Sequence, residues 1–170
     1  MVAGILMVVV MIAVAILAPL LSPKDPMAIN TYERLLPVSG NDWFGTDHLG
    51  RDVYARTIFG TRVSLLVGFL VSAVTVAVGT VIGLVTGYYK RVDMVVMRII
   101  DGVMSIPGLL LAIALMAIFG ASIQNVVIAL TITSTPAVVR LVRSQVLSLR
   151  EQPFVQAATA IGAPTHRILR

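Results

Sequence analysis

The sequence predicts an all-α, polytopic helical membrane protein, and three observations support this fold class. Hydrophobic residues make up 58% of the 170 residues, whereas about 45–50% is usual for a soluble domain. Charged residues make up only 12%, about half of the usual share. Two long runs, Val63–Tyr89 and Gly102–Val139, contain no charged residue. Because a membrane-crossing helix needs about 20 apolar residues, these runs exclude a soluble globular domain and a disordered chain.

Residues 1–21 form the first predicted transmembrane helix. They contain no charged residue and end at Pro19 and the Ser22-Pro23 turn. A cleavable signal peptide is the alternative, but such peptides begin with basic residues and have a shorter apolar core. Residues 22–62 then form a predicted loop that carries five basic and five acidic residues.

Residues 63–170 form a predicted transmembrane domain with three further spans. The first of these is about 63–87. The uncharged run that follows would reach roughly 57 Å as one helix, which is too long for a single crossing. A loop signal at Gly120-Ala121-Ser122 divides it into spans at about 102–119 and 123–139. Residues 140–170 remain as a hydrophilic tail.

The basic residues predict the orientation of the chain. Segment 88–101 and the tail 140–170 each contain more basic than acidic residues, so the net charge of +5 lies in these two segments. Lysine and arginine accumulate on the cytoplasmic side of membrane proteins. We therefore expect 88–101 and 140–170 to be cytoplasmic and 22–62 to lie outside. Because the charge follows the topology, no nucleic-acid partner is expected.

No pattern in the sequence indicates catalysis or metal binding. The chain has no cysteine, and its two histidines, His48 and His166, are predicted on opposite faces of the membrane. Gly45–Gly50 has the spacing of a phosphate loop, but Arg51 and Asp52 stand where such loops have lysine and serine or threonine. An acidic cluster around His48 fits an exposed polar loop better than a metal site. We expect no enzymatic activity and no metal site.

Three glycines recur every four residues in the second span: Gly79, Gly83 and Gly87. Residues four apart share one face of a helix, so this stripe lets another helix approach closely. Packing within a helix bundle is the favoured interpretation. A pore-lining face is the alternative.

Polar residues at two other places have more than one interpretation. Hydroxyl side chains surround Pro136 in the last span, at Thr131, Ser134 and Thr135. They either bond to carbonyls that the proline leaves free or line a path for a polar solute. Asp101 borders the third span, where we favour an interfacial or helix-start role over a functional site at membrane depth.

The tail contains a predicted short helix. Pro153 suits a first helical position, and Gly162 is a natural stop. Phe154, Ala157, Ala158 and Ile161 lie on one face of this helix. A small-sided helix of this kind suits insertion into a partner's groove, although it could fold back onto its own bundle. Pro164 could open another short helix.

Residues 140–162 resemble the EAA loop of ABC importer permeases. Gln156, Ala157, Ala158 and Gly162 occupy the positions of its E-A-A-x-x-x-G motif, with glutamine in place of glutamate. The string W-F-G-T-D-H-L-G-R-D-V at 43–53 resembles a signature of the dipeptide/oligopeptide/nickel branch, in its second, C-type permease subunit. The stretch from Asp101 to Gly108 is similar to that branch as well.

This resemblance implies a type I ABC importer (MetI-like) transmembrane domain in the cell membrane of a prokaryote. It implies alternating access in a heterodimer with a second homologous permease subunit. It also implies two ATP-binding cassette subunits that hydrolyse ATP, an extracytoplasmic solute-binding protein, and no cofactor on this chain. Di- or oligopeptides are the implied cargo, with nickel, glutathione or another peptide-like solute as alternatives. The residues implied to couple to the ATPase are Phe154, Gln156, Ala157, Ala158, Ile161 and Gly162.

Two departures from the family pattern lead us to expect a truncated chain. Such subunits have six spans, and this sequence ends at Arg170 within the EAA region. It also starts without their basic N-terminal stretch. A fragment of a secondary transporter or channel is the rival class. Such a transporter would carry carboxylates at mid-membrane, and the four predicted spans contain none.

Overall fold

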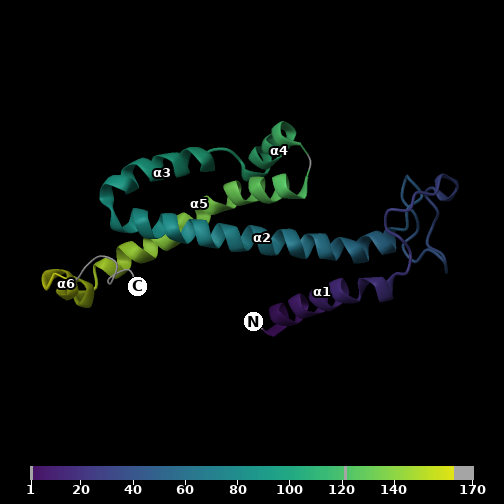
Figure 1. Ribbon diagram of the computed structural model, residues 1–170, viewed down its shortest axis with the longest axis horizontal. Helices are drawn as coiled ribbons and strands as arrows, with labels where there is room; N and C mark the ends of the chain where they lie inside the picture. The colour runs from purple at the N-terminus through teal and green to yellow at the C-terminus, as the bar shows by residue number, and fades with distance from the viewer. Residues whose placement is uncertain (1, 121, 163–170) are drawn as a thin grey trace. The chain divides into compact units, whose positions relative to one another are not determined.

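The computed structural model describes residues 2–120 and 122–162, and within them it is all-helical (Figure 1). Residues 163–170, which include the expectations for Pro164 and His166, lie outside the described residues. The fold class predicted from the sequence is confirmed. The chain divides into two units, residues 1–68 and 69–170, which are described separately.

The first unit begins with helix α1, Val2–Leu21, which covers the first predicted span. Most of the surface of α1 is exposed within this chain. Its uniformly apolar composition suits a helix that faces lipid. Arg62, near the start of the long helix α2 (Val53–Tyr88), donates hydrogen bonds to the carbonyls of Ala15 and Ile16 at 2.6 and 3.2 Å. These bonds hold the C-terminal part of α1 against α2.

The predicted outer loop is organised around Asp47. Its carboxylate accepts hydrogen bonds from the backbone N–H groups of Leu49 (2.8 Å) and Arg51 (3.1 Å). It also pairs with the guanidinium groups of Arg51, at 2.9 Å, and Arg56. Partial burial raises the pKa of Asp47, but these hydrogen bonds outweigh it and hold the pKa well below its ordinary value. The loop also contains a short 3₁₀ helix η1, Thr31–Glu33.

The glycines of the G-x4-G spacing have a structural role in this loop. Gly45 and Gly50 both adopt positive φ, +71° and +73°. A Cβ at Gly50 would lie 1.7 Å from the carbonyl oxygen of Asn30. Lys24 pairs with both Asp42 and Asp52 at 2.9 Å, so the acidic groups near the glycines face cations of the same chain. The glycines are therefore explained by turn geometry and close backbone contact.

The second unit contains the rest of α2 and four further helices. These are α3 (Lys90–Met104), α4 (Gly108–Phe119), α5 (Ile123–Arg150) and α6 (Pro153–Ala160). Helices α2 and α5 are longer than the spans 63–87 and 123–139. Helix α5 continues beyond Val139 because the residues that follow, rich in leucine and arginine, favour helix.

The third predicted span, 102–119, differs most from the structure. Helix α3 ends at Met104, and α4 begins only after Pro107. Proline disfavours a helical conformation of the residue before it, which explains the break. Helix α4 has 12 residues, about 18 Å, which is shorter than a bilayer core.

The number of membrane-spanning helices depends on this break. Helices α3 and α4 meet at an angle of 87°. Within the described residues, three helices are long and apolar enough to cross a membrane, or four if this bent pair forms one span. The arrangement of four spans stays a prediction.

Candidate coupling site

The short helix predicted in the tail is present as α6. Glu151 caps α5, and the chain restarts at Pro153, where the backbone N–H groups of Val155 and Gln156 donate to the carbonyl of Gln152 at 3.0 and 3.2 Å. The helix ends at Ala160, and Gly162 follows with φ +80°. A left-handed residue at this position is a common helix stop, for which glycine is best suited.

The two large apolar residues of the predicted face are exposed. Phe154 is 66% exposed and Ile161 is 85% exposed. Ala157 is exposed as well, whereas the side chain of Ala158 lies outside the described part of the structure. Phe154 and Ile161 are therefore not folded onto the described part of the bundle. They are available to a partner.

The glycine stripe of α2 faces α5. A Cβ at Gly79, Gly83 or Gly87 would lie 2.6–2.7 Å from the Cβ of a valine on α5, well inside a normal carbon–carbon contact. The three valines, in the same order along the chain, are Val138, Val142 and Val146. Both series advance by four residues, so α2 and α5 run parallel. Their C-terminal ends therefore lie at the same end of the bundle.

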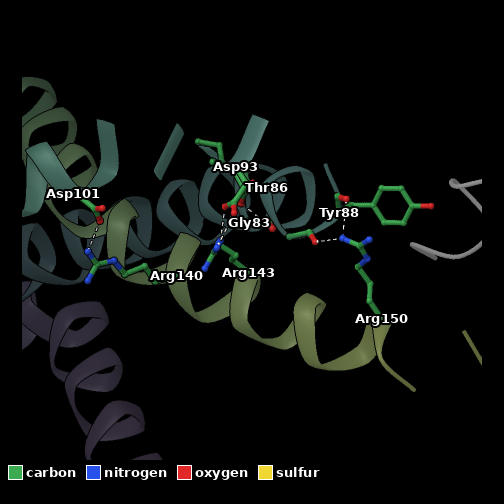
Figure 2. A network of polar contacts seen from close by, with 10 residues as sticks. Gly83, Thr86, Tyr88, Asp93, Asp101, Arg140, Arg143 and Arg150 are labelled. Atoms are coloured by element: carbon green, nitrogen blue, oxygen red, sulfur yellow. Dashed lines mark hydrogen bonds and ion pairs between the residues drawn. The ribbon is translucent and has the colours of Figure 1, made fainter. Parts of the chain in front are cut away.

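Two ion pairs attach α3 to α5, and Figure 2 shows them side by side. Arg143 forms two bonds with the carboxylate of Asp93, at 2.5 Å from Nε and 2.7 Å from Nη2. Arg140 pairs with Asp101 at 2.6 Å. Asp101 lies near the C-terminal end of α3, so of the two predicted roles the helix-start role is wrong, whereas the interfacial role stays a prediction. The physical reason is that α3 begins much earlier, at Lys90, where the chain turns after α2.

A third arginine of α5 contacts the end of α2. The guanidinium of Arg150 donates from Nη1 to the carbonyls of Gly87 and Tyr88, at 3.1 and 2.9 Å (Figure 2). It also lies over the ring of Tyr88, 5.2 Å from the centroid. Sequence reasoning identified these arginines only as positive charge.

The arginine spacing carried a signal that the sequence reasoning missed. Arg140, Arg143 and Arg150 are separated by three and seven residues, a pattern that places all three on one face of a helix. A single basic face on a helix that follows an apolar span indicates acidic or carbonyl partners on neighbouring elements. It indicates that these arginines face neighbouring elements, although not which residues they contact.

The three hydroxyl residues predicted near Pro136, which are Thr131, Ser134 and Thr135, have different surroundings in α5. Thr135 is buried, and its hydroxyl donates to the carbonyl of Thr131 at 2.7 Å, one residue before the carbonyl that Pro136 leaves without a helical donor. The Thr131 hydroxyl is buried and has no hydrogen-bond partner within the described residues. Ser134 is exposed. Of the three, Ser134 is thus the residue with access to a space outside the bundle.

Helix α6, the end of α5 and the end of α2 line an open pocket of about 430 Å³. Its lining residues are Tyr88, Arg150, Val155, Gln156 and Ala160. Within it, the Gln156 amide donates to the carbonyl of Glu151 at 3.2 Å. The base of α6 is therefore attached to the end of α5, which is attached to the end of α2.

These features define a helical membrane protein that offers a short exposed helix beyond its bundle. Residues 79–170 match the family model described as "Binding-protein-dependent transport system inner membrane component". The chain belongs to this family, which consists of transport permeases. The match covers α6 and the glycine-packed pair of α2 and α5.

Curated relatives are similar to nearly the whole chain. A dipeptide transport system permease protein of Alkalihalophilus pseudofirmus is 44% identical over 98% of this chain and 55% of its own length. A probable D,D-dipeptide transport system permease protein of Escherichia coli is 41% identical over 92% of this chain and 53% of its own. A glutathione transport system permease protein of Pectobacterium atrosepticum is 42% identical over 96% and 55%. The chain spans about half the length of the curated relatives that it matches.

Proposed function

We propose that this chain is a permease subunit of an ATP-driven ABC importer, and that it moves di- or oligopeptides across a prokaryotic inner membrane by alternating access. One observation carries the proposal. Helix α6 is held at the end of the bundle, with Phe154 and Ile161 exposed, in the segment that resembles the EAA loop. A partner ATPase with a groove for this face would be able to move the bundle.

The proposed partners follow from the family and from the chemistry of the chain. They are a second homologous permease subunit, two ATP-binding cassette subunits and an extracytoplasmic solute-binding protein. ATP hydrolysis belongs to the cassette subunits, and we propose no catalytic chemistry on this chain. The coupling residues are those on or beside α6: Phe154, Gln156, Ala157, Ala158, Ile161 and Gly162.

Peptide cargo is supported by the relatives whose names specify dipeptides. The relative named for glutathione, itself a small peptide, supports the same chemical class and keeps that solute as an alternative. We propose Ser134, which is exposed beside the buried Thr135, as the position where α5 contacts the path of the solute. In this proposal Thr131 and Thr135 support the helix from within.

The proposed topology places residues 22–62 outside and residues 88–101 and 140–170 in the cytoplasm. The parallel course of α2 and α5 supports it, because two parallel spans end on the same side of the membrane. The contact of Arg150 with the last carbonyls of α2 agrees with that arrangement. The tail is then on the side where ATP is available.

The test is a cross-link between α6 and a partner ATPase. The chain has no cysteine, so a single Ala157→Cys change introduces a unique thiol at an exposed position of α6. In membranes that contain the assembled transporter, we expect this thiol to cross-link to the ATPase, with a yield that changes when ATP is added. A cysteine at the exposed residue Asn41 of the outer loop serves as the control and should not cross-link. Absence of any ATPase adduct from position 157 would refute the proposal.

A further inference from the structure

We propose that Arg150 is a positioning residue, which ties the end of α2 to the base of α6 so that a movement of α6 is passed to α2. The inference rests on the proposed function, because it requires a partner that moves α6. It assigns the transfer of movement from α6 to α2 to one side chain, Arg150, which lies outside α6.

The contacts of Arg150 with α2 are of the kind that resists separation. The last four carbonyls of a helix have no partner within the helix, and they carry partial negative charge. Arg150 donates to two of these in α2, at Gly87 and Tyr88, and its guanidinium covers the Tyr88 ring. A fixed positive charge therefore caps the C-terminal end of α2.

The backbone of Arg150 lies close to α6. Arg150 is the last residue of α5, and α6 begins at Pro153. The Gln156 amide bonds to the carbonyl of Glu151 at 3.2 Å, which joins α6 to the residue next to Arg150. The contacts of Arg150 and of Gln156 together therefore join the end of α2, the end of α5 and the start of α6.

The helix pair beyond this contact is packed closely enough to move as one unit. Gly83 and Gly87 of α2 lie against Val142 and Val146 of α5, with no room for one additional methyl group. A closely packed contact of this kind transmits strain because it has little room to deform. A pull on the end of α2 is thus passed to the segment of α2 that packs on α5, Gly79–Gly87.

The experiment compares Arg150→Gln and Arg150→Lys with the wild type in proteoliposomes that contain the complete transporter. The measured quantity is the amount of solute taken up per ATP hydrolysed. We expect Arg150→Gln to lower it by roughly tenfold or more, because the two hydrogen bonds from a charged donor to Gly87 and Tyr88 are lost. Arg150→Lys keeps the positive charge but loses the forked N–H donors of the guanidinium, so uptake per ATP should fall by less than in Arg150→Gln. Arg98→Gln, at an exposed arginine of α3, is the matched control and should have no effect.

Two further measurements separate positioning from other roles. The cross-link from Ala157→Cys to the ATPase should persist in Arg150→Gln, because the exposed face of α6 is unchanged. If that cross-link is lost, Arg150 acts in docking and the inference is overturned. If Arg150→Gln lowers only the thermal stability and leaves uptake per ATP unchanged, the role is merely structural and the inference is again overturned. Failure of Ala157→Cys to cross-link when Arg150 is intact would instead count against the proposed function.

Discussion

Replacing Gly83 with alanine tests the close packing of α2 on α5. The new Cβ would lie 2.7 Å from the Cβ of Val142, 2.9 Å from its Cγ1 and 3.0 Å from the carbonyl oxygen of Val139. Carbon atoms in contact are about 3.5–4.0 Å apart, so the helices must separate by roughly 1 Å at this point. The third contact is with backbone, which cannot rotate away as a side chain can.

The expected cost follows from two opposing effects. Overpacking of a closely packed contact costs about 1–3 kcal/mol. Alanine in place of glycine within a helix regains up to about 1 kcal/mol. We therefore expect Gly83→Ala to reduce the free energy of unfolding by up to about 2 kcal/mol. A leucine at this position should prevent stable accumulation of the protein.

The assay is the temperature at which the detergent-purified protein loses its monodisperse elution profile. Gly68→Ala in the same helix is the matched control, because nothing lies within 4 Å of its new Cβ. It should leave this temperature unchanged or raise it. The double variant Gly83→Ala with Val142→Gly removes the two nearest atoms, so the two changes together should cost less than the sum of their separate costs. If Gly83→Ala and Gly68→Ala behave alike, the stripe does not face a helix and the packing argument fails.

Three further predictions concern the topology, the end of α6 and the outer loop. A cysteine at exposed Asn41 should react with a membrane-impermeant reagent in intact cells, whereas one at exposed Ser148 should not; the reverse pattern would place the tail outside. Gly162→Val should reduce ATP-driven uptake without affecting membrane insertion, because a β-branched residue resists φ +80°. Gly162→Asn is the control and should transport normally, because asparagine tolerates this conformation. Equal transport by both variants would contradict the predicted role of the helix stop. Because contacts in the folded loop lower the pKa of Asp47, its carboxylate stabilises the loop above pH of about 4 and loses this effect as pH falls further. Asp47→Asn should therefore increase proteolysis of the loop at pH 7. It should also abolish the increase in proteolysis that the wild type shows as pH falls. Unchanged proteolysis of Asp47→Asn at pH 7 would refute this prediction.

The sequence by itself determined the class of this protein and the position of its short helix. Long uncharged runs are sufficient to predict membrane helices, because lipid requires apolar side chains along the whole length of a crossing segment. The start of α6 at Pro153 and its stop at Gly162 were also readable, since proline and glycine fix backbone conformation locally. The four-residue spacing of glycines indicated a close helix contact, although not the helix that makes it.

Only the tertiary structure decided which helices meet and where the charged residues find their partners. Asp93 and Arg143 are 50 residues apart in the sequence, and nothing local to either residue identifies the other. The same holds for Arg150, whose partners are backbone carbonyls and therefore leave no residue type to recognise. The end of α3 at Met104 was missed because the uncharged run was divided by length and by its loop signal at residues 120–122, whereas Pro107 was the local signal for this break. Local preferences are encoded in neighbouring residues, whereas contacts between distant segments depend on how the whole bundle packs.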